Sequence, residues 1–277
     1  MSKISSLAQS ALVVLIAGLG LLNESQGAAS SRTLSGLSPT RIQADMTFPE
    51  PQASGQTPLK LTSRAKDYLI AESWWQKQID LTQNMLYDTC LFGDSISSSL
   101  GNTLGSRTFN FAMGGMTTTS LVDQLKALTP AKVKCQTAII AMGTNDADGS
   151  ITNDDFIKNL KTSISLVQGM GATKVFLIPA FYSTVEASHN PSLAGSISRV
   201  EEINALIRQV AAMEKVVLFE EDIQPLYQGQ SLRKELTIDG VHLNSDGQNI
   251  YRRALLKILS LPVKAGLTDS QPGASSG

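Results

Sequence analysis

The sequence TCLFGDSIS, residues 89–97, places a short apolar run directly before a glycine, an aspartate and a serine. Its first four residues are β-branched, aromatic or otherwise apolar, which favours a buried strand, and Gly93 and Asp94 are typical of a turn. Ser95 would then stand just beyond the carboxyl end of a strand, where ligands bind in parallel α/β sheets. Ser95 is therefore a candidate functional residue, and the rest of the chain decides whether it has partners.

Four more segments share the apolar, β-rich character of this strand, and helical patterns separate them. The segments are 108–111, 137–142, 174–178 and 216–219. Apolar residues recur on one helical face within 156–167 and within 197–210. Strands that alternate with helices form a parallel sheet covered on both faces. We therefore expect an α/β domain, a three-layer α/β/α sandwich with a five-stranded parallel sheet.

Small and polar residues follow the predicted strands at the ends where ligands bind. The first strand is followed by Ser95, the second by Gly114 and Gly115, and the third by Asn145. The segment Asp239-Gly240-Val241-His242 precedes the last predicted helix. Because the carboxyl ends of parallel strands meet at one edge of a sheet, we expect these four segments to converge there.

In order and spacing, these four segments resemble the sequence blocks of the SGNH, or GDSL-type, hydrolase superfamily over roughly residues 89–259. The resemblance implies a flavodoxin-like fold and a serine esterase that needs no metal or cofactor. It implies Ser95 as the nucleophile, His242 as its general base and Asp239 as the residue that orients the imidazole. It also implies an oxyanion hole formed by the backbone N–H groups of Ser95 and Gly115 and the side-chain amide of Asn145.

The chemistry of acyl transfer requires these residue types independently of the resemblance. A serine hydroxyl is a weak nucleophile near neutral pH, so a base must accept its proton, and neutral imidazole has the right affinity for it. A carboxylate on the other ring nitrogen fixes the tautomer and stabilises the imidazolium. A glycine lets a backbone N–H approach the developing oxyanion without a side chain in the way. The four segments together therefore predict ester hydrolysis more strongly than any one of them.

Structural interpretations of the same residues remain open. Asn145 could be a helix N-cap, and Asp239-Gly240 could be an ordinary turn. His189, the second histidine of the chain, lies in a polar stretch where we expect exposure. A metal site is a further alternative, although only one histidine would join it and the serine, glycine and asparagine would stay unexplained. The residues that could form it are Asp94, Asp146, Asp148, Asp239 and His242.

Two residues depart from the family pattern, and both could reshape the substrate pocket. Met116 stands where the second block often has aspartate, and Leu243 stands where the last block often has proline. We expect Met116, with Phe181 and Tyr182, to form a small apolar wall beside the oxyanion hole. No long apolar segment that could act as an acyl-binding lid appears in the loops after the strands. The sequence therefore predicts a preference for short acyl chains.

The N-terminal region predicts export. Lys3 is followed by the apolar or small run 11–22 and then by small residues that allow cleavage after Gly27. We expect residues 1–27 to be a signal peptide and the protein to be secreted or periplasmic. If residues 11–22 stayed uncleaved they could anchor the chain, but this run is shorter than the roughly 18 residues that favour a membrane span.

Composition divides the rest of the chain. Residues 28–60 are rich in Ser, Thr, Pro, Gly and Gln and are expected to be a flexible linker. Residues 61–262 are expected to form the hydrolase domain, and the small polar residues of 263–277 a disordered tail. The division predicts one catalytic domain with appendages.

Two local details are predicted inside the domain. The apolar spacing of 62–88 indicates an N-terminal helix that packs Trp74 and Trp75 against the domain, although paired tryptophans can also stack on a sugar. Ser245 and Gln248, three residues apart, predict a capping box at the start of the last helix.

The cysteines, Cys90 and Cys135, are predicted to be buried free thiols, although export would allow a disulfide. Cys90 lies five residues before Ser95, and Cys135 lies ten residues before Asn145. If both strands end at the same level, the cysteines are offset by about 16 Å at about 3.3 Å per residue. A disulfide requires Cα atoms within about 7 Å of each other.

The charge of the chain limits its partners. The formal net charge is -1, which provides no broad basic surface for a phosphate backbone, so nucleic acid is not expected as a partner. The expected substrate is a small-molecule or carbohydrate ester. Two alternatives remain: an O-acyltransferase that passes the acyl group to an envelope polysaccharide, and a non-catalytic glycan-binding module on the same fold.

Overall fold

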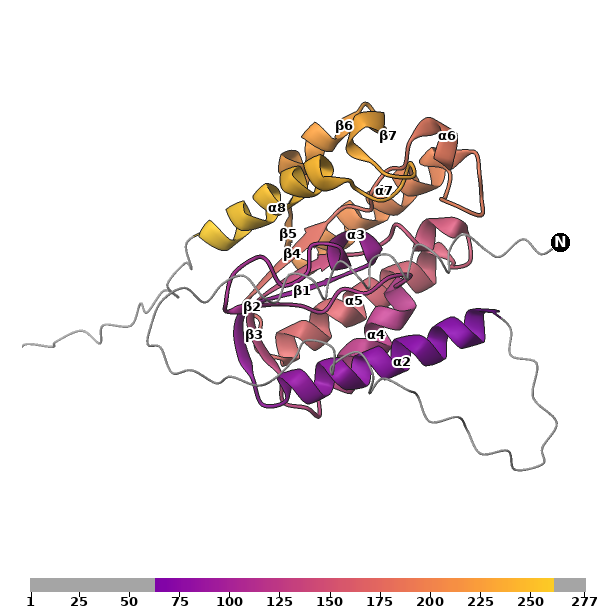
Figure 1. Cartoon of the computed structure of the whole chain (residues 1–277). Coiled ribbons are helices and arrows are strands. Elements are labelled where there is room, and N and C mark those ends of the chain that lie inside the picture. The colour runs from indigo at the N-terminus through magenta and orange to yellow at the C-terminus, as the bar shows by residue number, and fades with distance from the viewer. Residues whose placement is uncertain (1–62, 262–277) are drawn as a thin grey trace, which may run out of the picture.

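The computed structural model describes residues 63–261 (Figure 1). The predicted signal peptide, the linker 28–60, the tail 263–277 and the proposed domain boundaries at 61 and 262 lie outside the described residues. Within 63–261, no helix is long and apolar enough to cross a membrane.

A five-stranded parallel sheet forms the centre of the domain and confirms the predicted fold class. Its strand order is β2-β1-β3-β4-β5. All neighbouring strands run parallel. The strands are β1 Leu86–Gly93, β2 Thr108–Asn110, β3 Lys134–Ala141, β4 Lys174–Ile178 and β5 Val217–Leu218.

Helices cover both faces of the sheet, with α8 on one face and α2, α4 and α5 on the other (Figure 1). The longer helices are α2 Ser63–Thr82, α4 Thr118–Leu128, α5 Asn153–Gly169, α7 Ile197–Glu214 and α8 Ser245–Ser260. The short elements are α3 Ser95–Ser98, α6 Val185–Ser188, the 3₁₀ helices η2 Asp146–Asp148, η3 Glu221–Leu226 and η4 Lys234–Leu236, and the hairpin β6 Tyr227–Gln228 with β7 Ser231–Leu232.

The two apolar faces of the sheet belong to separate core clusters. Ile140 packs in the cluster that includes α4, α5 and α7, whereas its neighbour Ile139 packs in the cluster that includes α3, η3 and α8. Both side chains are buried because successive residues of a strand point to opposite faces and helices cover both. The predicted helix faces are confirmed: Phe156, Leu160, Ile164 and Val167 are buried, and so are Val200, Ile207 and Val210, with Ile197 partly buried.

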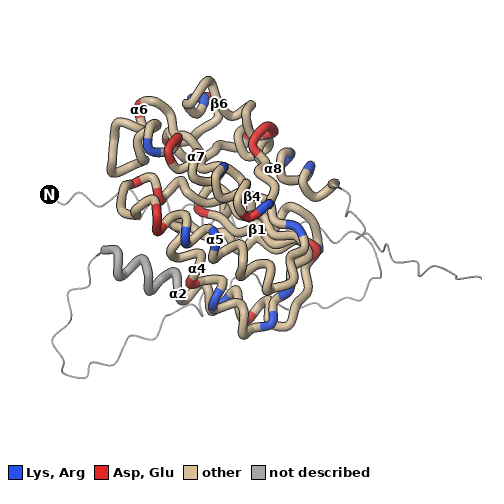
Figure 2. Tube along the Cα trace, turned by 180° about the vertical axis from the view of Figure 1, so that it is seen from behind, with Lys and Arg blue, Asp and Glu red and all other residues tan. Residues whose placement is uncertain are grey.

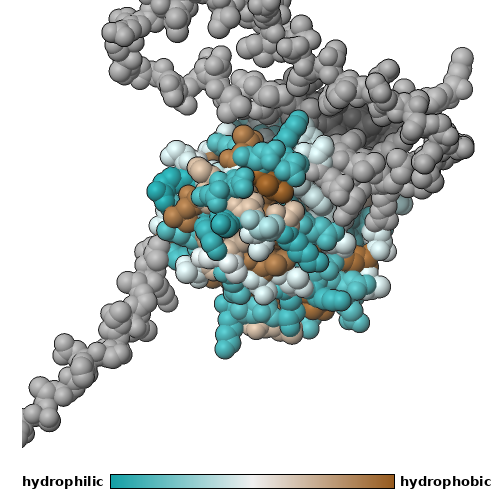
Figure 3. Space-filling view, turned by 90° about the horizontal axis from the view of Figure 1, so that it is seen from below, coloured by the Kyte–Doolittle hydropathy of each residue, from teal (hydrophilic) through white to brown (hydrophobic). Residues whose placement is uncertain are grey.

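Charged residues of both signs are interspersed along the described chain, as Figure 2 shows. The face seen in Figure 3 is mostly hydrophilic, with hydrophobic residues in small scattered groups. The described trace in Figure 2 carries no long basic segment that would attract a polyanion.

Two predicted element boundaries are wrong. The N-terminal helix ends at Thr82 rather than at 88, because Asn84 adopts a left-handed conformation with φ of 60° and Leu86 then pairs with Lys134 in the sheet. The last helix is capped by Asn244 rather than by Ser245. The Asn244 side chain accepts the first free backbone N–H groups of α8, from Asp246 and Gly247 at 3.1 Å each.

The two tryptophans of α2 lie in different environments. Trp75 is buried at 4% exposure in the cluster with α4 and α5, whereas Trp74 is half-buried and carries the Lys77 ammonium 4.5 Å from its ring centroid. Trp75 therefore docks α2 onto the domain, as expected.

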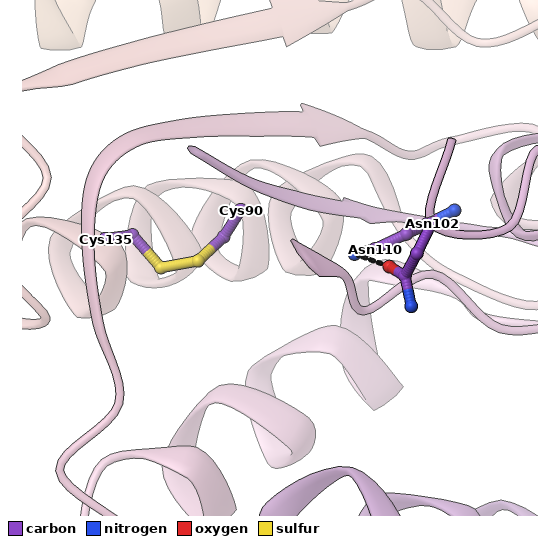
Figure 4. The surroundings of a disulfide bond; sticks show 4 residues. All are labelled: Cys90, Asn102, Asn110 and Cys135. Carbon is purple, nitrogen blue, oxygen red and sulfur yellow. Dashed lines mark hydrogen bonds between the residues drawn. A yellow bond between two sulfur atoms is a disulfide. The ribbon is translucent and has the colours of Figure 1, made fainter. Parts of the chain in front are cut away.

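The prediction of two free thiols is also wrong, because Cys90 and Cys135 form a disulfide with Cα atoms 5.8 Å apart (Figure 4). The register pairs Cys90 with Ala138 and Cys135 with Tyr87, so the offset is three residues and not five. The ladder lacks a pair between Tyr87 and Thr89. Tyr87 and Cys90 on β1, like Cys135 and Ala138 on β3, are three residues apart and yet lie in the same core cluster, whereas residues three apart on a regular strand point to opposite faces. Both strands therefore bend there and bring the cysteines together.

Candidate active site

The turn after β1 presents Ser95 at the carboxyl edge of the sheet. Asp94 is the N-cap of α3, and its carboxylate accepts the backbone N–H of Ile96 at 3.0 Å. Gly93 is required by close packing, since a Cβ there would lie 2.6 Å from the Cβ of Ser97. The chain therefore turns sharply out of the strand, and half-buried Ser95 becomes the first residue of the short helix.

A hydrogen-bond chain joins Ser95, His242 and Asp239. The Nε2 atom of His242 lies 3.0 Å from the Ser95 Oγ, and its Nδ1 lies 2.8 Å from Oδ2 of Asp239. The other oxygen of Asp239 accepts the backbone N–H groups of Val241 at 3.0 Å and His242 at 2.8 Å. The carboxylate is thereby fixed against the imidazole, which fixes Nδ1 as the protonated nitrogen and leaves Nε2 free to accept a proton.

The loop that carries Asp239 and His242 is held by its own hydrogen bonds. Thr237 and Leu243 form an antiparallel bridge, and the Thr237 hydroxyl donates to the His242 carbonyl at 2.7 Å and accepts the Gly240 N–H at 2.9 Å. Gly240 has a φ of 92°, where a side chain would be strained. Leu243, the residue in place of the family's proline, is buried at 1% exposure and anchors the loop in the core.

The pair Asp239–His242 has the protonation properties of a catalytic base. Burial alone would raise the pKa of Asp239, but its hydrogen bonds with the His242 side chain and backbone and the Val241 N–H lower it to about 2. The hydrogen bond with Asp239 raises the pKa of His242, burial opposes this, and the negative charges of Asp239 and Asp94 add to the increase. Asp239 is therefore ionised across the working range of pH, and His242 titrates above its ordinary value.

We expect kcat/KM for ester hydrolysis to rise with pH as His242 loses its proton, because only the neutral imidazole can accept the Ser95 proton. Since the pKa of His242 is raised from 6.5, the half-maximal kcat/KM is expected above pH 6.5. Asp239→Asn should move the midpoint down and lower the rate. The measurement is kcat/KM for a chromogenic ester between pH 5 and 9.

The matched control for this profile is His189→Gln, because His189 is exposed at the C-cap of α6 and lies outside the hydrogen-bond chain. This variant should keep the wild-type profile. A profile that does not change with pH in the wild type would contradict the role of His242 as the base.

The loop after β2 lies beside Ser95. A Cβ on Gly114 would lie 4.0 Å from the Ser95 Cβ, and Gly115 follows with a left-handed φ of 75° and open space where its Cβ would be. Asn110 starts this loop: its side chain donates to the carbonyls of Ser97 and Gly101 and accepts the Ala112 N–H, while its own N–H is bound by Asn102 (Figure 4). Gly115 is therefore an exposed residue with no neighbour where a side chain would be.

Asn145 does not act as a helix cap. It occupies the N-cap position of η2, but its side chain makes no capping hydrogen bond. Its amide nitrogen instead donates to the Met116 carbonyl at 2.9 Å, and the residue is half-buried. One hydrogen of that amide nitrogen is thus left for another acceptor.

The predicted apolar wall is wrong. Met116, Phe181 and Tyr182 are 2%, 3% and 9% exposed, because all three point into the core. The surface beside Asp239 is instead a shallow groove of about 460 Å³ between α6 and the loop before His242. Its lining is a mixture of polar and apolar surface and consists of Thr184, Glu186, Ala187, Asn190, Leu193, Lys234, Thr237, Ile238, Asp239 and Gly240.

The acidic residues considered as metal ligands lie in separate interactions. Asp94 caps α3, Asp146 binds Thr118, Asp148 accepts the Ser150 N–H at 2.7 Å, and Asp239 binds His242. Among residues 63–261, no three His, Cys, Asp or Glu side chains are grouped to hold a metal ion. The contact between Asp146 and Thr118 had no signal in the sequence, because it joins two loops whose sequences are ordinary by themselves.

The chain matches one known protein family, but no curated protein. A family model described as the GDSL-like lipase/acylhydrolase family matches residues 87–250.

Several solved structures share the fold. A putative acylhydrolase from Bacteroides fragilis has a TM-score of 0.56 and 18% identity, over 68% of this chain and 94% of that one. A GDSL-like lipase from Bacteroides thetaiotaomicron has a TM-score of 0.56 and 17% identity, over 68% and 96%. A protein described as a putative platelet activating factor from Streptococcus pneumonia has a TM-score of 0.52 and 20% identity, over 70% and 99%. At these identities the likeness shows the fold.

Proposed function

The chain belongs to the GDSL-like lipase/acylhydrolase family of SGNH hydrolases, enzymes that act on ester bonds, and we propose that it hydrolyses carboxylic esters through an acyl-enzyme on Ser95. The observation that carries this proposal is the hydrogen-bond chain from Ser95 through His242 to Asp239, with distances of 3.0 and 2.8 Å. Ser95 meets His242, 147 positions away, and Asp239, three residues before His242, in the geometry of a nucleophile, its base and the base's orienting carboxylate.

The reaction follows from this geometry. The Ser95 Oγ attacks the ester carbonyl carbon while Nε2 of His242 takes the hydroxyl proton. The carbonyl oxygen becomes negative and accepts hydrogen bonds from the N–H groups of Ser95 and Gly115 and the amide of Asn145. When the intermediate collapses, the C–O bond to the alcohol breaks and His242 returns the proton to the leaving oxygen. A water molecule then repeats the attack on the acyl-enzyme and releases the acid and Ser95.

The surfaces around Ser95 support a short acyl group and a polar alcohol. The three large side chains near the oxyanion loop are buried in the core and offer no exposed surface to a long acyl chain. The leaving alcohol must lie near His242, because His242 protonates it. The groove is lined by Asp239, which binds the His242 imidazole, and not by Ser95 or His242 themselves, so a long alcohol portion would reach it. Asn190 and Lys234 can bind hydroxyl groups there, and Ile238, 73% exposed, offers an apolar surface to a sugar ring. A carbohydrate O-acetyl ester fits this combination.

We expect kcat/KM to be higher for an acetyl than for a dodecanoyl ester of p-nitrophenol, measured below micelle concentrations. With O-acetylated oligosaccharides, released acetate should be the product, and Lys234→Ala should raise KM for these substrates while kcat/KM for p-nitrophenyl acetate stays unchanged. The p-nitrophenyl group carries no hydroxyl that the Lys234 ammonium could bind, so only the sugar substrate should sense Lys234.

Lys257→Ala is the matched control. Lys257 is an exposed lysine paired with Asp222 at 2.7 Å, much as Lys234 is paired with Glu186 at 2.6 Å, but it lies on α8. Faster hydrolysis of the dodecanoyl ester would contradict the short-chain proposal. Equal effects of both lysine variants would remove the groove from substrate binding. Transfer of acetyl to an added glycan, with no release of acetate, would favour the acyltransferase alternative.

We also propose that the protein is exported, as the N-terminal sequence predicts. The buried disulfide between Cys90 and Cys135 supports this proposal, since disulfides persist in oxidising compartments. N-terminal sequencing of the protein from its native compartment is expected to start after Gly27. An uncleaved chain with reduced cysteines in the cytoplasm would contradict export.

A further inference from the structure

Two loops that carry predicted oxyanion donors are tied to each other at two points. The first loop runs from Gly115 to the start of α4, and the second is the turn from β3 into η2. The amide nitrogen of Asn145 donates to the Met116 carbonyl at 2.9 Å. In the opposite direction, Thr118 donates to the carboxylate of Asp146, the next residue after Asn145.

The bridge between Thr118 and Asp146 is buried and consists of three contacts made by two donors. The Thr118 hydroxyl lies 2.6 Å from Oδ1 of Asp146, and the Thr118 backbone N–H lies 3.0 Å from Oδ1 and 3.1 Å from Oδ2. Both residues have an exposure of 0%. Thr118 is the first residue of α4, where a free N–H and the helix dipole favour a negative charge. Burial nevertheless raises the pKa of Asp146 to about 6, and its bonds with Thr118 oppose that increase.

The two contacts close a ring that orients the Asn145 amide. The ring runs from the Asn145 side chain to the Met116 carbonyl, along the backbone to Thr118, across to Asp146 and back to Asn145. Met116 accepts one hydrogen of the Asn145 amide nitrogen and so fixes the direction of the second one. Gly114 and Gly115 have no side chains to pack, so this part of the loop is held by the buried Met116 side chain together with these hydrogen bonds.

We propose that Asp146 and Thr118 are a positioning pair that holds the Asn145 amide toward the oxyanion. This inference rests on the proposed esterase function. Neither residue touches the reacting atoms: Asp146 acts through Thr118 and the Met116 carbonyl. The pair should therefore affect the rate of the chemical step and not the binding of the ground-state substrate.

Thr118→Val tests the pair, because valine keeps the shape of threonine and the backbone N–H but removes the hydroxyl donor. We expect kcat for p-nitrophenyl acetate to fall about tenfold, which corresponds to about 1.4 kcal/mol, with KM within about twofold of wild type. Thr118→Ser, which keeps the hydroxyl, should restore most of kcat. Asp146→Asn should lower kcat in the same way and gives a second variant should the valine variant not fold.

Thr129→Val is the matched control, since Thr129 caps the other end of α4 and its hydroxyl donates to the Leu125 carbonyl at 2.8 Å. It should change the melting temperature at most. The specific readout is a double variant: in an Asn145→Ala background, Thr118→Val should lower kcat by less than about threefold, because the amide to be positioned is gone.

Three outcomes would overturn the positioning pair. They are a normal kcat in folded Thr118→Val or Asp146→Asn, an undiminished tenfold loss in the Asn145→Ala background, and a loss in Thr129→Val as large as that in Thr118→Val. An inactive wild-type enzyme would instead reject the proposed function, so the two failures are distinguishable.

Discussion

Ser95→Ala is expected to abolish measurable turnover, with kcat lowered by about 10⁶-fold, as for the loss of the nucleophile in other serine hydrolases. Without the Ser95 Oγ no acyl-enzyme forms, and His242 has no proton to take. The residual rate would come from the oxyanion donors and substrate binding, which supply about 10³- to 10⁴-fold over water. The measurements are kcat for p-nitrophenyl acetate and covalent labelling by a fluorophosphonate, with mass spectrometry of the labelled peptide. The wild type should carry the label on Ser95 alone, and the variant should carry none.

Ser99→Ala provides the control for this variant. Ser99 follows the same short helix, and its hydroxyl donates to the Ile96 carbonyl at 2.7 Å. Both labelling and turnover should survive this change. An active or labelled Ser95→Ala enzyme would show that another residue is the nucleophile.

Asn145→Ala is expected to lower kcat by about 10²- to 10³-fold with KM nearly unchanged, a loss of about 2.7 to 4 kcal/mol of transition-state stabilisation. The amide donates to an oxygen that is negative only in the tetrahedral intermediate, so the interaction is strong there and weak in the ground state. Asn145→Asp should be at least as harmful. A carboxylate removes the donor, repels the oxyanion and faces the Met116 carbonyl, which now accepts from the amide at 2.9 Å. Steady-state kinetics and the melting temperature of both variants decide the matter.

A helix cap would show the reverse order, because aspartate caps a helix about as well as asparagine, whereas alanine typically costs about 1 kcal/mol. Asn145 makes no capping hydrogen bond, so this order is not expected. Asn244 is the matched control, since its side chain does cap α8. Asn244→Asp should keep the stability of the wild type and Asn244→Ala should lose some, with kcat unchanged in both. A near-normal kcat in Asn145→Asp would remove this residue from the mechanism.

The sequence by itself determined the α/β architecture and indicated which residues lie at the carboxyl edge of the sheet. Short apolar runs and helical spacing are local signals, and strands covered on both faces leave such runs almost without interruption. The residues after the strands were found because parallel strands end at one edge of a sheet. The meeting of Ser95 with His242, 147 positions away, was implied by the resemblance of the four segments to the blocks of the SGNH hydrolases.

Tertiary structure alone decided the features that depend on register and packing. The disulfide was missed because the register of β1 against β3 and the bend in both strands set the distance between Cys90 and Cys135, and neither leaves a periodic signal. Burial of Met116 depends on which way its side chain points after the turn at Gly115. The contact of Thr118 with Asp146 joins two loops whose sequences are ordinary by themselves. Such contacts depend on how all elements of the domain pack together, and a local sequence pattern carries no information about that packing.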